Sequence, residues 1–290
     1  MSKIYWDKIR LLVTNYCNYH CSFCHNEGQS QRDSAVFMDY STFERFVEII
    51  KDQEISELCF SGGEPFLNPN LVQMIEYADK SLACEIGCAS NLSLISEEQI
   101  RRLSKTRVKF NVQFPYVTPE KFHRSTGNGD MDRTVGRIMA VKNAGIAIGL
   151  NTVVQSKSED DVRNMVLFAL DSELPLKFLP QIGLFGSGDF KGFVYPILKE
   201  YAVEYYDKGT GATKWLLEHK NHKTTVLYID SPCFTQDIER CKKYGEIRIL
   251  PDMYIQTCIL KNKTIRLNLE DDKTVAQKQL IEIWKNFNHC

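Results

Sequence analysis

The strongest constraint on the fold is a regular alternation of strand-like runs with amphipathic helical segments over the first 182 residues. Helix starts lie between the runs, among them the predicted capping boxes Ser41–Glu44 and Ser96–Gln99. This alternation predicts an α/β fold with a parallel sheet and right-handed crossovers. The pattern alone fits both a doubly wound sheet and a partial barrel. Six runs are expected to be strands: Ile9–Thr14, Glu57–Ser61, Ala83–Ala89, Val108–Phe114, Ile146–Val154 and Lys177–Ile182.

The pattern changes after residue 182. A glycine-rich stretch, Gly183–Gly188, is expected to connect two parts of the chain. We therefore predict a first domain over residues 1–190 and a smaller α+β domain over residues 191–290. Within the second part, residues 198–219 look helical, and residues 224–268 hold short β-branched runs typical of hairpins. Residues 273–287 are expected to form a closing helix.

Composition excludes some classes of partner. The chain is 43% hydrophobic and 25% charged, with a formal net charge of -1. This balance gives no electrostatic reason to expect nucleic acid or a membrane surface as partner. The sequence contains neither a long apolar run nor a signal peptide at its start, so we expect a cytoplasmic protein.

Ten cysteines are many for such a protein, and in a reducing compartment they suggest metal ligands or catalytic groups. Cys17, Cys21 and Cys24 form a Cys-x3-Cys-x2-Cys pattern directly after the first predicted strand. Such spacing lets one loop wrap an iron–sulfur cluster. Three thiolates leave one iron of a [4Fe–4S] cluster open for another ligand, as in catalytic zinc sites. A structural zinc site completed by His20 or His25 is the alternative.

The other cysteines fall into two groups. Cys59, Cys84 and Cys88 lie in apolar strand-like runs, and we expect them to be small buried side chains. Four more lie in the last 60 residues, where they either bind metal or are unconnected thiols: Cys233, Cys241, Cys258 and Cys290.

The cysteine spacing after a first strand resembles the radical S-adenosylmethionine (SAM) superfamily. The resemblance implies a [4Fe–4S] cluster whose open iron binds SAM. It implies that an electron from the cluster cleaves SAM to a 5′-deoxyadenosyl radical, which abstracts hydrogen from a substrate. The fold implied is a partial (β/α)6 barrel of the TIM type, with its site at the carboxyl ends of the strands.

A second motif carries the same resemblance. Ser61 to Pro65 reads Ser-Gly-Gly-Glu-Pro and follows the second predicted strand, as in the superfamily. There the motif binds the methionine ammonium group of SAM, and the aromatic residue before the third cysteine lies near the adenine. Polar residues at the ends of other strands surround SAM as well. The SAM-binding residues implied are Phe23, Gly62, Gly63, Glu64, Asn91 and Asn151.

Residues 8–182 resemble the GTP 3′,8-cyclase branch more closely, through Ile9–Leu11, Cys24–Gly28 and Lys121–Gly127. That branch binds GTP at a second cluster held by C-terminal cysteines. The stretch from Cys241 to Cys258 is similar to twitch or SPASM auxiliary-cluster domains, with Met253 where glycine is usual.

The resemblance implies a set of ligands for a second [4Fe–4S] cluster, namely Cys233, Cys241 and Cys258. Cys290 is the catalytic candidate, as a hydrogen donor to a substrate radical. Two other interpretations of Cys290 are a fourth cluster ligand and a thiol without a function at a chain end.

The chain departs from that branch where GTP would bind. Where that branch has a pair of arginines, this chain has Glu246 and Arg248. Where that branch has two further basic residues, this chain has Asn68 and Gly149. A triphosphate requires several Arg or Lys groups. The sequence therefore disfavours GTP as the substrate.

We expect a radical SAM enzyme that dehydrogenates, epimerises or cyclises a small-molecule substrate, with a flavodoxin or ferredoxin as electron donor. The alternatives are an enzyme that modifies a peptide, a GTP 3′,8-cyclase, and a zinc-bound interaction module. The few residues before Cys17 leave no room for a leader-binding domain, which favours the small molecule.

Overall fold

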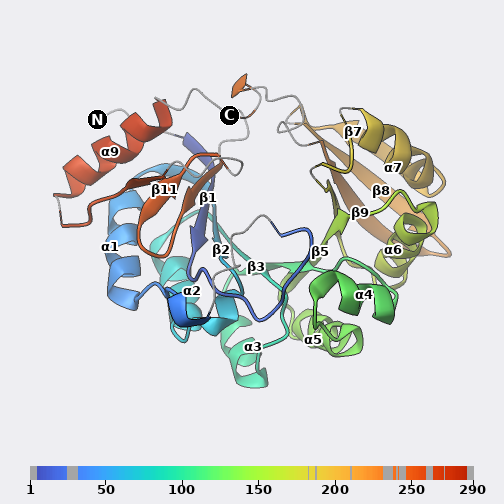
Figure 1. The fold of residues 1–290 in the computed structure, drawn as a ribbon, viewed down its shortest axis with the longest axis horizontal. Helices are drawn as coiled ribbons and strands as arrows, with labels where there is room; N and C mark the ends of the chain where they lie inside the picture. Colours follow the sequence, from blue (N-terminus) through green and yellow to red (C-terminus); the bar gives the residue numbers. More distant parts are fainter. Residues whose placement is uncertain are drawn as a thin grey trace.

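The computed structural model shows an α/β protein built on one curved sheet (Figure 1). It describes residues 5–24, 32–181, 183–186, 188–209, 211–230, 238–239, 241, 246–258, 264–270 and 272–285. Among these residues, twelve strands pair in the order β12-β11-β10-β1-β2-β3-β4-β5-β6-β9-β8-β7. The strands of the first half of the chain are β1 (Tyr5–Leu12), β2 (Glu54–Ser61), β3 (Glu85–Ser90), β4 (Lys109–Gln113), β5 (Ala147–Val154) and β6 (Leu176–Pro180).

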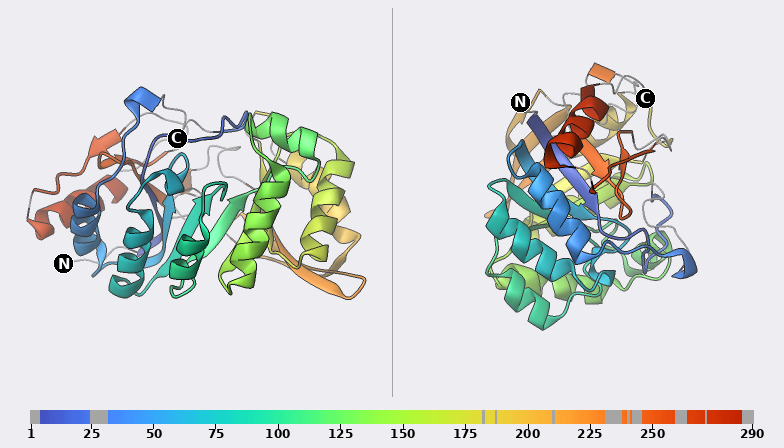
Figure 2. Two further views of the ribbon diagram at one scale, coloured as in Figure 1. Left: turned by 90° about the horizontal axis from the view of Figure 1, so that it is seen from below. Right: turned by 90° about the vertical axis from the view of Figure 1, so that its left-hand side faces the viewer.

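These six strands are parallel, and each pairs with the next along the chain. Helices between them cover the outer side of the sheet, where they stand in a row (Figure 2). The connecting helices are α1 (Tyr40–Ile50), α2 (Leu71–Ser81), α3 (Glu97–Leu103), α4 (Pro119–Thr126), α5 (Met131–Asn143) and α6 (Glu159–Asp171). The α/β class, the parallel sheet and all six predicted strands are confirmed, and the architecture is that of a partial TIM-type barrel.

Local sequence signals set the helix starts. Ser96 and Gln99 form the expected capping box at the start of α3. At α1 the expected box is wrong, because Asp39 is the N-cap and its carboxylate accepts from the Thr42 amide. Aspartate caps as well as serine does, so a capping residue two positions earlier took the place of Ser41.

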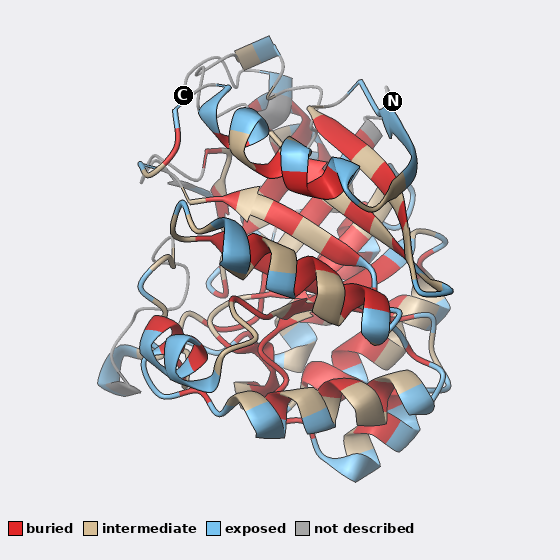
Figure 3. Cartoon of the chain, turned by 90° about the vertical axis from the view of Figure 1, so that its right-hand side faces the viewer, coloured by how far each residue is buried: buried red, intermediate tan, exposed pale blue. Residues whose placement is uncertain are grey.

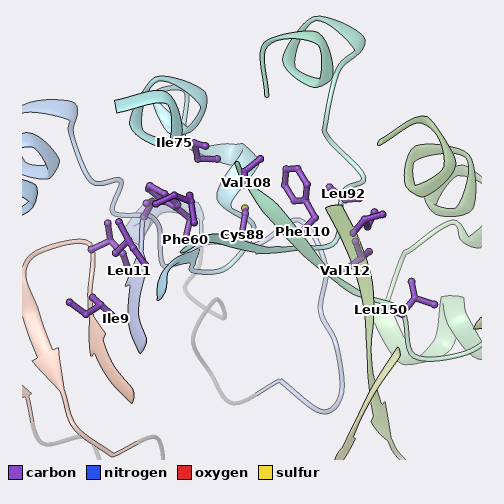
Figure 4. Close-up of a cluster of buried hydrophobic side chains, with 14 of the residues drawn as sticks. Ile9, Leu11, Phe60, Ile75, Cys88, Leu92, Val108, Phe110, Val112 and Leu150 are labelled. Carbon is purple, nitrogen blue, oxygen red and sulfur yellow. The ribbon is translucent and has the colours of Figure 1, made fainter. Parts of the chain in front are cut away.

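The core lies between the outer face of the sheet and these helices. Leu11, Phe60, Cys88 and Phe110 project from successive strands, and Ile75 of α2 packs with them (Figure 4). The helices turn buried residues towards the sheet and exposed ones outwards (Figure 3). Cys88 is therefore a small core residue, as its apolar context predicts.

The inner face of the sheet is polar, because alternate residues of a strand point to opposite faces. Lys8 and Arg10 of β1 point inwards, while their neighbours along the strand enter the core. The same alternation places Asn111 of β4 and Lys177 of β6 on this inner face. A charged inner face is a place for a ligand rather than a packed core.

The remaining strands extend both edges of this sheet. On one side, β9 (His222–Ile229) pairs parallel to β6 and continues antiparallel to β8 (Ala212–His219) and β7 (Ala202–Asp207). The helical expectation for residues 198–219 is therefore wrong over these strands. Thr213 and Trp215 favour strands, and Gly209 and Gly211, both with positive φ, form the bend between β7 and β8.

On the other side, β10 (Glu246–Ile249) pairs parallel to β1 and is followed by β11 (Tyr254–Gln256) and β12 (Thr264–Arg266). Hairpins were predicted within residues 224–268, and one joins β10 to β11, with Met253 at positive φ in its turn. The closing helix α9 (Lys273–Lys285) is also present, and it lies beside α1, where Gln277 donates to the Ile49 carbonyl. The division of the chain near residue 190 stays a prediction.

The described residues also form two short 3-10 helices, η1 (Arg32–Ser34) and η2 (Pro65–Leu67), and the helix α7 (Asp189–Lys199). No helix among the described residues is long and apolar enough to cross a membrane.

Candidate functional site

The cysteine loop, residues 15–24, follows β1 at the carboxyl end of the sheet. It is held by the end of α4: the Thr126 carbonyl accepts from the His20 amide at 2.9 Å, and the Ser125 carbonyl accepts from the Ser22 amide at 3.1 Å. Gly127 ends α4 at positive φ and lies against His20. The stretch Lys121–Gly127, which carries part of the family resemblance, thus serves to position the cysteine loop.

The Gly-Gly-Glu-Pro segment lies against the other side of this loop. The Gly63 amide donates to the Thr14 carbonyl at 2.9 Å, and the Glu64 amide donates to the Tyr16 carbonyl at 3.0 Å. A Cβ at Gly63 would stand 2.0 Å from the Tyr16 carbonyl oxygen, and one at Gly62 would stand 2.4 Å from that of Thr14. The two glycines are required because two backbones approach closely here.

Glu64 is fully buried and ties three segments together. Its carboxylate accepts from the Ser90 hydroxyl at 2.7 Å and from the Asn91 amide at 2.8 Å, both at the end of β3. It also accepts from the Phe66 amide, which caps η2. Burial raises the pKa of Glu64 to about 7, and the three hydrogen bonds act in the opposite direction. In this structure Glu64 therefore joins the motif to the end of β3.

Asn91 extends the network to the cysteine loop. Its side-chain amide donates to the Asn18 side-chain oxygen at 3.0 Å and lies 4.0 Å from the Cys17 sulfur. Asn18 in turn donates to the Ser93 hydroxyl at 2.8 Å. The structure thus brings Cys17, Glu64 and Asn91 together at one end of the sheet, as expected from the sequence.

The three loop thiols also lie near one another. Burial raises the pKa of Cys17 and of Cys21 to about 12, and the charge of neighbouring Cys24 adds to both shifts. Each thiol is half-buried, as is Phe23 beside them. No three His, Cys, Asp or Glu side chains in the described part are grouped as ligands of a single metal ion would be.

This donor set fits a [4Fe–4S] cluster, which takes one thiolate per iron and so needs no convergence on one point. Binding would release the thiol protons.

A row of polar groups crosses the inner face of the sheet, and two of its members were missed from the sequence. Gln113, Asn151 and Lys177 are aligned in register on β4, β5 and β6. The Gln113 side-chain nitrogen and the Asn151 side-chain oxygen are buried and have no hydrogen-bond partner among the described residues. Buried polar groups normally have partners, so this row is prepared for a ligand. Only Asn151 was predicted, because Gln113 and Lys177 belong to no motif.

Arg10 and the carboxyl-terminal part of the chain form a charged group on the same face. Glu246 accepts from Arg10 at 2.9 and 3.3 Å and from Arg248 at 2.8 Å. Burial works against both charges, yet Arg10 lowers the pKa of Glu246 and Glu246 raises that of Arg10. Arg10 is thus neutralised within the protein. Asn68, at another expected basic position, braces the Val13 and Met38 carbonyls instead.

The predicted ligands of a second cluster are described only in part. Cys241 is half-buried and precedes β10, and Cys258 is buried just after β11. Cys258 lies close enough to Arg248 to influence its pKa. Cys233 and Cys290 lie outside the described residues, so their assignments stay predictions.

Comparison with known proteins identifies the class. Residues 11–169, more than half of the chain, match the model of the radical SAM superfamily. The chain therefore belongs to the radical SAM superfamily, and it is an enzyme whose cofactors are a [4Fe–4S] cluster and SAM.

Several curated proteins similar to this chain are named GTP 3′,8-cyclase. One from Clostridium perfringens strain 13 is 21% identical, with 96% of this chain and 88% of that protein covered. A probable GTP 3′,8-cyclase from Methanocaldococcus jannaschii is 25% identical, with 93% and 89% covered.

Among solved structures, Streptococcus suis SuiB bound to S-adenosylmethionine aligns with a TM-score of 0.73 at 14% identity. The alignment covers 98% of this chain and 67% of SuiB. At this identity the likeness shows the fold alone.

Proposed function

We propose that this enzyme uses SAM to abstract a hydrogen atom from a small polar substrate bound on the inner face of the barrel. The observation that carries this proposal is the pair of polar side chains on the inner face, Gln113 and Asn151, which have buried atoms without a hydrogen-bond partner in the described structure. The donor and the acceptor lie in the carboxyl-terminal halves of β4 and β5. Because buried polar groups normally form hydrogen bonds, we expect a bound polar ligand to supply their partners.

The chain's own residues have distinct roles in this proposal. Cys17, Cys21 and Cys24 would hold the cluster, which when bound supplies the electron that cleaves SAM. Glu64 keeps the Gly-Gly-Glu-Pro segment in place, so that Gly62 and Gly63 are held against the loop at the expected position of SAM.

Other residues complete the SAM site. Asn91 fixes Asn18 and lies beside Cys17, while Phe23 is on the loop where the adenine is expected. Asn151 and Gln113 offer an acceptor and a donor to the polar atoms of SAM or substrate. A flavodoxin or ferredoxin is the proposed electron donor.

A second [4Fe–4S] cluster belongs to the proposal, with Cys233, Cys241 and Cys258 as its ligands. Cys258 supports this assignment because it follows β11 and lies near Arg248, at the edge of the charged inner face. Cys290 is proposed as a hydrogen donor to the substrate radical, or as a fourth ligand.

GTP cyclisation is the second candidate, because the curated relatives that share nearly the full chain carry that name. The charges of the inner face weigh against it. Arg10 is paired with Glu246, and glycine occupies position 149. Modification of a peptide remains an alternative, and nothing in the described site favours it over a small molecule.

One assay separates the two candidates. Anaerobically reconstituted protein is mixed with SAM, a strong reductant and GTP, and both 5′-deoxyadenosine and GTP are quantified. The proposal predicts that SAM is cleaved slowly and that GTP is neither consumed nor stimulatory. Conversion of GTP with one 5′-deoxyadenosine per turnover would replace the proposal by GTP cyclisation.

A further inference from the structure

A cavity of about 270 Å³ opens on the inner face at the amino-terminal half of the strands. Its charged and polar lining is Lys8, Glu57, Glu85, Lys109, Asn111 and Lys177. Small residues make the space: Gly87, Ala147 and Gly149 lie at its wall. A Cβ at Gly87 would stand 2.3 Å from a Glu57 carboxylate oxygen, so a side chain there would displace the lining.

The charges of this cavity do not cancel. Three lysines and two glutamates leave one positive charge. Lys8 pairs with Glu57 at 2.7 Å, and Lys109 pairs with Glu85 at 2.7 Å. Lys177 has neither a hydrogen bond nor an ion pair to any other residue that the structure describes.

Lys177 is half-buried, and partial burial of an unpaired ammonium disfavours its charged form. Burial, with nearby Lys8 as the next cause, lowers the pKa of Lys177 to about 8. A charged group with a perturbed pKa inside a cavity is a candidate for binding a ligand of opposite charge.

The position of Lys177 links the cavity to the polar row. Lys177 on β6 is in register with Asn151 on β5, and neighbouring strands are about 5 Å apart. An anionic group bound by Lys177 would therefore leave the rest of a small molecule beside the row where SAM is proposed to bind.

We propose that this cavity binds the carboxylate of a small substrate through Lys177. The inference rests on the proposed function, and it adds the substrate class: a compact molecule with one anionic group. One unpaired cation balances one negative charge, whereas a polyphosphate would need several. Asn111 offers a neutral hydrogen-bonding partner on the same wall.

The test uses reconstituted enzyme with 13C-labelled lysine Cε atoms, observed by NMR. The Lys177 signal is assigned by its absence from Lys177→Met. Sodium acetate, acetamide and pyrophosphate are titrated at constant ionic strength. We expect acetate to shift the Lys177 signal saturably and acetamide to leave it in place. Pyrophosphate should bind no more tightly than acetate.

Lys51→Met is the control, because Lys51 lies outside the cavity lining and is paired with Glu48 at the end of α1. This variant should bind acetate within about twofold of wild type. The proposal is overturned if acetate gives no saturable shift of the Lys177 signal, or if pyrophosphate binds there at least tenfold more tightly. SAM cleavage is measured separately, so its failure would refute the proposed function and leave the ligand class of the cavity intact.

Discussion

At the scale of single residues, the site is fixed by a few contacts that a motif search sees only in part. Gly63 and Glu64 were predicted to touch SAM, and the structure adds that they meet the backbone of the cysteine loop and the end of β3. Gln113 and Lys177 carry no sequence signal, because their meaning comes from strand register and from the lack of a partner in the described structure. Neither the strand register nor the lack of a hydrogen-bond partner can be read directly from the amino-acid sequence.

Gly63→Ala should disturb the cysteine loop, because its Cβ would stand 2.0 Å from the Tyr16 carbonyl oxygen. Backbone atoms cannot yield as a flexible side chain can. We expect a loss of about 2 kcal/mol in unfolding free energy and loss of about half of the bound iron. Iron analysis and thermal unfolding check both.

Gly136→Ala is the control, since a Cβ there meets nothing within 4 Å in α5. It should keep its iron and gain about 0.5–1 kcal/mol. If Gly63→Ala binds as much iron as wild type, the close approach of residue 63 to the Tyr16 carbonyl is not required for iron binding.

Lys177 should make stability depend on pH in the alkaline range. Its folded pKa of about 8 is below the ordinary 10.5, so the folded state disfavours the charged form. The resulting loss of folding free energy is complete below pH 8 and disappears as the pH rises to 10.5. Lys177→Met should therefore be more stable than wild type at pH 7, by at most about 3 kcal/mol.

This difference should shrink between pH 8 and 10.5. Denaturant unfolding at several pH values measures it for both proteins. A difference that stays constant with pH would mean that Lys177 is solvated or paired.

At the scale of elements, strand positions were predicted well because each core strand has a strong apolar run, as in Glu57–Ser61 within β2. The helix predicted over residues 198–219 was wrong because Gly209 and Gly211, both with positive φ, form a bend between two strands. The placement of β10 beside β1 was not predictable, since it joins segments more than 230 residues apart. This pairing alone brings Glu246 to Arg10.

The junction of β1 and β10 should depend on Glu246. Its side chain is 19% exposed and holds both Arg10 and Arg248. Glu246→Gln leaves two arginines facing each other with one carboxylate fewer, so we expect a loss of roughly 2–3 kcal/mol, somewhat less than for fully buried pairs.

Glu85→Gln provides the comparison, because its pair with Lys109 is 60% and 50% exposed. It should cost under about 1 kcal/mol. Equal losses in the two variants, measured by denaturant unfolding, would mean that the Glu246 pairs contribute no more than a surface ion pair.

At the scale of the whole molecule, the superfamily was predicted from two motifs, and the barrel from the resemblance to that superfamily. The identity of the substrate could not be predicted from the sequence. The enzyme should carry two clusters, one on each part of the chain. Reconstituted wild type should bind about eight iron atoms, and a Cys17/Cys21/Cys24→Ala variant about four. If wild type binds about four iron atoms and the variant none, the enzyme has a single cluster, and Cys233, Cys241 and Cys258 are not cluster ligands.

The central claim is that the loop of Cys17, Cys21 and Cys24 supports reductive cleavage of SAM. It is tested most directly by the amount of 5′-deoxyadenosine formed from SAM by reduced, reconstituted protein. We predict formation by wild type and by Cys88→Ala, whose cysteine lies in the core. Cys21→Ala should form none above the protein-free background. Equal formation by Cys21→Ala and wild type, or none by a wild type loaded with iron and sulfide, would contradict the account.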